Sequence, residues 1–134
     1  MRPELLNALT LAYLGDAIFE VYVREYLITE KGLTKPNDLQ KASVRYVSAI
    51  AQAAFMKEAL IQNWLSDEEL AVYKRGRNTK GRNVKNKSVL THNQSSGFEA
   101  LIGQLYLKHK ETRIEEIFEL YKNYIDLADS VQQS

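Results

Sequence analysis

Hydrophobic positions recur with helical spacing through residues 11–28, and this stretch organises the rest of the chain. Its apolar positions at spacings of three, four and seven are Leu11, Leu14, Ile18, Val21 and Ile28. Most remaining positions are also apolar or aromatic, so most of the circumference of this helix is expected to be buried. Yet Asp16, Glu20 and Arg24 follow one another at intervals of four and form a polar stripe along one face. Because a carboxylate on a buried helix is costly unless it is paired or binds a cation, this stripe is the first candidate for chemistry.

The same periodicity predicts further helices and no convincing strand pair, so the expected fold class is all-α. A short helical lead over residues 4–9 precedes the central helix, which should end near Gly32 because glycine is favoured just past a helix C-terminus. Pro36 fits the first turn of the next helix. A break near Ser48 then divides two helices, although one bent helix has the same pattern.

Two capping boxes predict the starts of later helices. Ser66 is followed three residues later by Glu69, and Thr112 is followed in the same way by Glu115. Each pair precedes an apolar set with helical spacing. We expect a helix to begin at each pair.

Composition places the chain among ordinary globular proteins. It has 134 residues, 45% of them hydrophobic and 26% charged, which suits one domain spanning residues 1–134. The absence of cysteine excludes disulfides and thiolate metal sites. There is neither an apolar run of about 20 residues nor a signal-peptide pattern. The expectation is a soluble cytoplasmic protein with no membrane partner.

Positive charge is concentrated in one acid-free segment between Glu69 and Glu99. Its seven basic residues are Lys74, Arg75, Arg77, Lys80, Arg82, Lys85 and Lys87, and the rest of the chain carries 11 basic and 17 acidic residues. Residues 79–91 are rich in Gly, Asn and Lys and predict a surface loop, with apolar periodicity resuming at Phe98. This asymmetry favours a polyanionic partner bound through a defined patch; a merely solvated loop is the alternative.

Two carboxylates stand beside glycines within apolar helical patterns. Asp16 directly follows Gly15, and Glu99 lies between Gly97 and Gly103. Because glycine within a helix costs about 1 kcal/mol relative to alanine, these glycines are better explained by close approach of another backbone or a ligand. Two carboxylates on two core helices could converge on Mg²⁺, which needs only one or two protein carboxylates and retains several waters.

Structural roles are the alternative explanation for the same carboxylates. Glu99 could close a capping box with Ser96, and Asp16 could pair with Arg24 or with a lysine elsewhere. Glu20 fits better as the partner of Arg24 than as a metal ligand. The two histidines, His92 and His109, have no second histidine at ligand spacing and are treated as ordinary surface or packing residues.

Two motifs resemble the ribonuclease III family. Residues 11–17, Leu-Ala-Tyr-Leu-Gly-Asp-Ala, resemble its signature helix, and residues 98–107, Phe-Glu-Ala-Leu-Ile-Gly-Gln-Leu-Tyr-Leu, resemble its second motif. Residues 15–24, 35–39 and 74–78 resemble the short subgroup, Mini-ribonuclease III, a catalytic domain that lacks a double-stranded-RNA-binding domain. The resemblance covers nearly the whole chain, and it implies a ribonuclease III-like helical bundle.

The function that the resemblance implies is a homodimeric, Mg²⁺-dependent endoribonuclease that cleaves double-stranded RNA. It further implies maturation of large-subunit ribosomal RNA precursors in a bacterial cytoplasm. Asp16 and Glu99 occupy the family's catalytic and metal-binding acidic positions, whereas Ala12 and Ser96 replace two other acids of the full-length enzymes. Tyr13 lies where the family places an aromatic that inserts across the dimer interface; a plain core aromatic is the alternative.

The implied mechanism is hydrolysis of a phosphodiester by water that Mg²⁺ orients and acidifies. The residues expected to contact RNA are Arg75, Arg77, Lys80, Arg82, Lys85 and Lys87. Such flexible cations suit A-form RNA, which is recognised mainly by phosphates, 2′-hydroxyls and shape. Two rivals remain: a non-catalytic RNA-binding or ribosome-assembly module on the same fold, and a helical protein-interaction adaptor, which would not require the basic segment.

Overall fold

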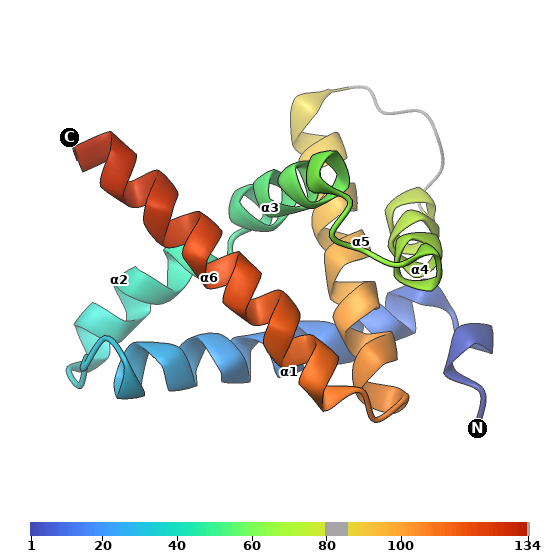
Figure 1. Cartoon of the computed structure of the whole chain (residues 1–134), viewed down its shortest axis with the longest axis horizontal. Helices are drawn as coiled ribbons and strands as arrows, with labels where there is room; N and C mark the ends of the chain where they lie inside the picture. Colours follow the sequence, from blue (N-terminus) through green and yellow to red (C-terminus); the bar gives the residue numbers. More distant parts are fainter. Residues whose placement is uncertain (80–85, 134) are drawn as a thin grey trace.

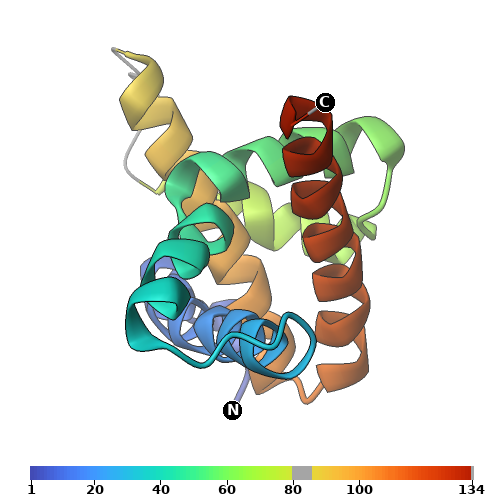
Figure 2. The ribbon, with the colours of Figure 1, turned by 90° about the vertical axis from the view of Figure 1, so that its left-hand side faces the viewer.

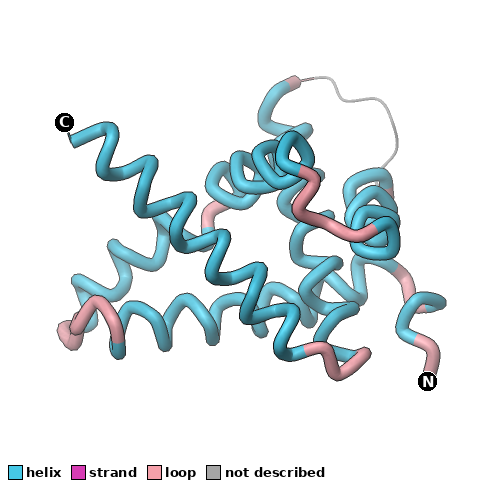
Figure 3. Tube along the Cα trace, in the orientation of Figure 1, coloured by secondary structure: helices cyan, strands magenta, loops and turns pink. Residues whose placement is uncertain are grey.

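The computed structural model describes residues 1–79 and 86–133, with backbone only at 132 and 133. No strand occurs in these ranges, which confirms the all-α prediction (Figure 3). The elements labelled in Figure 1 follow a short 3-10 helix, η1 (Pro3–Leu5), and are α1 (Ala8–Thr29), α2 (Pro36–Val47), α3 (Ala49–Gln62), α4 (Asp67–Asn78), α5 (Lys87–Leu107) and α6 (Glu111–Gln133). No helix within the described ranges is long and apolar enough to cross a membrane.

Helix α5 shares the central place with α1. It packs against α1, α3, α4 and α6 and crosses α1 steeply (Figure 1). Figure 2 shows α6 along one side of the molecule, while the first turns of α5, drawn in yellow, project at the other side. The two motifs singled out in the sequence therefore lie on the two helices that cross at the centre of the fold.

The crossing of α1 and α5 is a contact between backbones. A Cβ added to Gly15 of α1 would lie 1.7 Å from the carbonyl oxygen of Glu99, and one added to Gly103 of α5 would lie 2.0 Å from that of Leu11. No side chain fits at either position, since real Cβ atoms do not approach other atoms so closely. The prediction that a close backbone approach explains the glycine before Asp16 is confirmed.

Aromatic rings fill the core beneath this crossing. Phe19 of α1 lies 5.0 Å from the ring of Phe98 on α5 and 4.8 Å from that of Tyr121 on α6, both in edge-to-face geometry. Phe55 of α3 lies 4.9 Å from Tyr121. The Tyr121 hydroxyl donates a 2.5 Å hydrogen bond to the carbonyl oxygen of Tyr46 on α2, so the aromatic cluster and this bond connect five helices.

Several predicted helix boundaries are confirmed by their capping bonds. The break at Ser48 separates α2 from α3, and the Ser48 hydroxyl accepts a hydrogen bond from the Ala51 N–H. Ser66 and Glu69 form both bonds of the capping box, at 2.9 and 3.1 Å. Gly32 adopts φ 68° just after α1, the left-handed conformation that glycine tolerates at a helix end.

Two predicted boundaries are wrong. Helix α5 begins at Lys87, where the Asn86 side chain accepts from the Val89 N–H at 2.9 Å, so the last part of the loop predicted over residues 79–91 is helical. These first turns are exposed and carry no apolar stripe, so the spacing of hydrophobic residues does not predict them. Helix α6 already includes Thr112, so that residue is not an N-cap.

The helical lead predicted over residues 4–9 is split. The short helix η1 ends at Leu5, and α1 begins at Ala8 after the Asn7 side chain accepts a 2.8 Å hydrogen bond from the Leu9 N–H. The Arg75 guanidinium of α4 donates a 2.7 Å hydrogen bond to the Leu6 carbonyl between them. The N-terminal segment is thereby fastened to α4.

Substitution of Gly103 by alanine is expected to lower the free energy of unfolding by about 3 kcal/mol, because the added methyl group forces α1 and α5 apart. Gly32→Ala is the matched control: no atom lies within 4 Å of its Cβ position, so only the cost of its positive φ remains, about 1 kcal/mol. Urea unfolding at fixed protein concentration measures both. Equal losses in the two variants would contradict the close-contact account.

Candidate active site

Two carboxyl groups meet where α1 and α5 cross. Asp16 follows Gly15 on α1 and is exposed, and Glu99 on α5 is half-buried. The carboxyl groups interact directly, by hydrogen bonding and by like charge. The predicted convergence of these two residues from helices about 80 positions apart is therefore present in the structure.

The electrostatics of the pair are unusual for carboxyl groups. Burial, reinforced by the neighbouring Asp16, raises the pKa of Glu99 to about 8. Within the described ranges Asp16 has no ion pair with a basic residue. Two adjacent carboxyl groups with no cationic side chain between them form an arrangement that a bound cation would stabilise.

The structural alternatives for these carboxylates fail. Ser96 lies within α5, so Glu99 cannot be the third residue of a helix capped by it. Arg24 does not pair with Asp16, because its guanidinium donates a 2.8 Å hydrogen bond to Glu20. The predicted pairing of Glu20 with Arg24 is confirmed.

A third polar residue at the site was not anticipated from the sequence. Gln52 of α3 is fully buried, interacts through its amide with Glu99, and accepts a 2.5 Å hydrogen bond from the Ser95 hydroxyl. Its only sequence signal is that it is the lone polar side chain in the apolar run 49–56. That signal does not reveal which residue it faces.

The donor set suits Mg²⁺. No group of three or more metal-ligating side chains occurs in the described part of the chain, and the site offers Asp16 and Glu99 alone. Mg²⁺ is held in proteins by one or two carboxylates and keeps several waters, whereas Zn²⁺ prefers nitrogen and sulfur ligands. The histidines give no alternative centre, since neither His92 nor His109 belongs to such a group.

The basic segment borders the helices that carry the site. Arg75 and Arg77 lie in the last turns of α4, and Lys87 lies in the first turn of α5. The Arg77 guanidinium stacks 5.6 Å from the ring centre of Tyr73, while Arg75 is engaged with the Leu6 carbonyl. The other three predicted contacts, Lys80, Arg82 and Lys85, lie outside the described residues.

One face of α1 lies open rather than buried, contrary to the sequence expectation. We call this the open face of α1; its residues are Tyr13, Ala17, Val21 and Ile28. Tyr13 is 84% exposed, so its alternative role as a core aromatic is wrong. Sequence periodicity cannot distinguish an apolar surface that packs within the chain from one that remains for another molecule.

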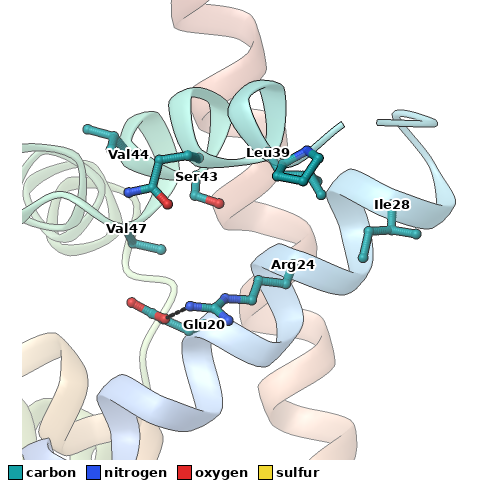
Figure 4. Close-up of a pocket in the computed structure, with 9 residues that line it drawn as sticks. Glu20, Arg24, Ile28, Leu39, Ser43, Val44 and Val47 are labelled. Carbon is teal, nitrogen blue, oxygen red and sulfur yellow. Dashed lines mark hydrogen bonds and ion pairs between the residues drawn. The ribbon is translucent and has the colours of Figure 1, made fainter. Parts of the chain in front are cut away.

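A groove continues this open face between α1 and α2 (Figure 4). Its volume is about 430 Å³, and the Glu20–Arg24 pair lies on its α1 side. The opposite wall includes Leu39, Val44 and Val47 of α2. The α1 side of this groove thus begins one helical turn beyond Asp16.

Comparison with known proteins identifies the family. Residues 9–110 match the Ribonuclease III domain, a range that contains both carboxylates and the crossing of α1 and α5. The chain belongs to the ribonuclease III domain family and is thereby placed among the endoribonucleases.

Curated relatives and a solved structure agree with this placement. The Mini-ribonuclease 3 of Brevibacillus brevis is 52% identical over 116 residues, which cover 86% of this chain and 84% of that protein. The Mini-ribonuclease 3 of Enterococcus faecalis is 48% identical over 113 residues, covering 84% and 85%. A crystal structure of a Fusobacterium nucleatum protein superposes with a TM-score of 0.74 at 30% identity, covering 85% and 91%.

Substitution of Glu99 by glutamine is expected to stabilise the metal-free protein at pH 8 by roughly 1–2 kcal/mol, because an ionised Glu99 is unfavourable beside Asp16. The folded protein holds the Glu99 proton up to about pH 8, and the unfolded chain releases it near 4.5. The stability that Glu99 contributes is therefore full below pH 4.5 and is lost as pH rises to 8.

Urea unfolding of wild type and Glu99→Gln at several pH values between 4 and 9, in the presence of a chelator, measures this difference. The two stability curves should diverge as pH rises. Curves that stay parallel across this range would contradict the raised pKa of Glu99.

Proposed function

We propose that this chain is a Mg²⁺-dependent endoribonuclease that hydrolyses phosphodiester bonds in double-stranded RNA. The observation that carries the proposal is the meeting of Asp16 and Glu99 at the crossing of α1 and α5. Membership of the ribonuclease III domain family and the names of the curated relatives support the reaction class. The catalytic and metal-binding residues are Asp16 and Glu99.

The two carboxylates have different tasks because their surroundings differ. Exposed Asp16 presents an oxygen ligand at the surface where a phosphodiester can approach, while Glu99 supplies a ligand from the protein side. When bound, Mg²⁺ supplies Lewis acidity and acidifies a water for in-line attack on phosphorus. Because Glu99 must be deprotonated to act as a ligand, metal binding below pH 8 releases a proton.

Double-stranded RNA is the substrate class that suits the charge distribution. The proposed contacts are Arg75, Arg77, Lys80, Arg82, Lys85 and Lys87. Their side chains carry cations able to follow phosphates of an A-form helix without reading bases. Arg75, Arg77 and Lys87, the described members of this set, have no carboxylate partner, and Arg75 also holds the N-terminal segment through the Leu6 carbonyl.

A homodimer is the assembly that we propose for cleavage of a duplex. The open face of α1 carries the exposed aromatic Tyr13 and is continuous with the groove against α2. A second copy is its proposed occupant, because the two strands of a duplex need two active sites related by symmetry. Tyr13 is assigned to this interface.

The proposed biological substrate is a large-subunit ribosomal RNA precursor in the cytoplasm, which is what the resemblance of the two sequence motifs to the short ribonuclease III subgroup implies. A non-catalytic RNA-binding or ribosome-assembly module is the second candidate. It is favoured by Ala12 and Ser96, which stand where the full-length enzymes carry acids. Cleavage by the purified protein separates the two candidates.

Substitution of Asp16 by asparagine is expected to lower cleavage of duplex RNA by about 100-fold or more, because one of two ligands loses its charge. Folding and dimer formation should stay near wild type, since Asp16 is exposed. Asp38→Asn, an exposed aspartate on α2, is the matched control and should cleave normally. Gel analysis of a labelled duplex with Mg²⁺ or with chelator reads out the result, and full activity of Asp16→Asn would refute the catalytic assignment.

Replacement of Arg77, Arg82, Lys85 and Lys87 by glutamine is expected to flatten the salt dependence of RNA binding. Each lost phosphate contact lowers the slope of log affinity against log salt by roughly 0.9, so the slope should fall by up to about 3–4. The control replaces four other exposed lysines, namely Lys35, Lys41, Lys57 and Lys110. Fluorescence anisotropy at several salt concentrations, without Mg²⁺, measures both slopes, and an equal slope in the first variant and wild type would place the RNA elsewhere.

A further inference from the structure

A buried amide lies against the inner side of the proposed metal site. Gln52 of α3 has no exposed surface, although glutamine is rarely buried completely. The Ser95 hydroxyl of α5, itself buried, donates a 2.5 Å hydrogen bond to the Gln52 Oε1. The amide oxygen is thus satisfied by a residue one helical turn before Glu99.

The amide nitrogen of Gln52, unlike its oxygen, lacks a hydrogen bond among the described residues. Within the described part of the chain, Gln52 Nε2 is a buried nitrogen that makes no hydrogen bond. Leaving such a donor unpaired costs about 1–3 kcal/mol, so a glutamine here is a poor choice for stability alone. The group that this amide interacts with is the carboxyl of Glu99.

The geometry fixes which end of the amide faces Glu99. Ser95 and Glu99 are four residues apart on α5 and therefore lie on the same face, which α3 covers. With Oε1 bound to Ser95, the N–H groups are the end left for the carboxylate. The reverse orientation would place the amide oxygen against an ionised Glu99, which is repulsive.

We propose that Gln52 is a positioning residue that holds the Glu99 carboxylate from the buried side, with Ser95 orienting the amide, so that Glu99 presents its ligand oxygen beside Asp16. This role rests on the proposed Mg²⁺ site. Hydrogen bonds to a metal-ligating carboxylate restrict its rotation, and their loss weakens metal binding by about 10–100-fold. Gln52 has no exposed surface, so it can affect a bound metal only through Glu99.

Titration calorimetry of the full chain with Mg²⁺ alone tests the proposal. Gln52→Met has nearly the volume of glutamine and removes both polar ends, and it is expected to weaken Mg²⁺ binding by about tenfold. Its stability in chelator should stay near that of wild type, because the unpaired Nε2 donor is removed while the Ser95 hydroxyl loses its acceptor. Gln104→Met is the matched control, since Gln104 is also buried on α5 and is not part of the site; its Mg²⁺ affinity should be unchanged.

Ser95→Ala supplies a second variant that leaves Gln52 in place but removes the bond that orients its amide. We expect it to weaken Mg²⁺ binding less than Gln52→Met does, and it decides the question if Gln52→Met does not fold. If both variants bind Mg²⁺ with wild-type affinity, the role proposed for Gln52 is overturned, while the proposed metal site is not. A wild-type protein that binds no Mg²⁺ would overturn the proposed metal site as well. A loss of stability in Gln52→Met without Mg²⁺, together with wild-type affinity for Mg²⁺, would show a merely structural role.

Discussion

The direct contact between the backbones of α1 and α5 is the constraint on which the rest of the structure depends. Gly15 and Gly103 leave no space for a side chain, so the residues that follow or precede them are brought within reach of the opposite helix. Asp16 and Glu99 meet as a consequence. The glycines cost helix stability locally, and what they permit is a site shared between two helices distant in sequence.

The adjacent carboxyl groups of the site also lower the stability of the folded protein. A half-buried carboxyl beside another carboxyl prefers to keep its proton, which is why the pKa of Glu99 lies near 8. Such strain is common where function requires charges that the fold alone does not balance. A bound cation would resolve it, and the buried amide of Gln52 offers a partial compensation from the protein side.

Much of the fold follows from sequence patterns, because capping chemistry is local. Ser48, Ser66 and Glu69 set helix starts through bonds within a few residues, and the structure contains those bonds. The start of α5 was missed because its exposed first turns have no apolar stripe. Thr112 is not an N-cap because α6 already includes it. The spacing between Thr112 and Glu115 alone does not show whether the helix begins at Thr112 or before it.

The candidate site, like the fold, is only partly predictable from the sequence. Asp16 and Glu99 were identifiable from the resemblance and from their glycine neighbours, whereas Gln52 became visible only when the packing of α3 on α5 placed it beside Glu99. The open face of α1 was expected to be buried, because an apolar residue such as Val21 does not reveal in the sequence whether it packs within the chain or against another molecule. Long-range packing, rather than local propensity, decides both features.

The most direct test of the central claim is to locate a bound metal ion. Crystals of the protein soaked in Mn²⁺, an anomalous scatterer that takes the same oxygen ligands as Mg²⁺, should show an anomalous peak between the carboxylates of Asp16 and Glu99. Crystals of Asp16→Asn treated in the same way should lack it. A peak elsewhere in the wild-type protein, with none between these two residues, would contradict the account.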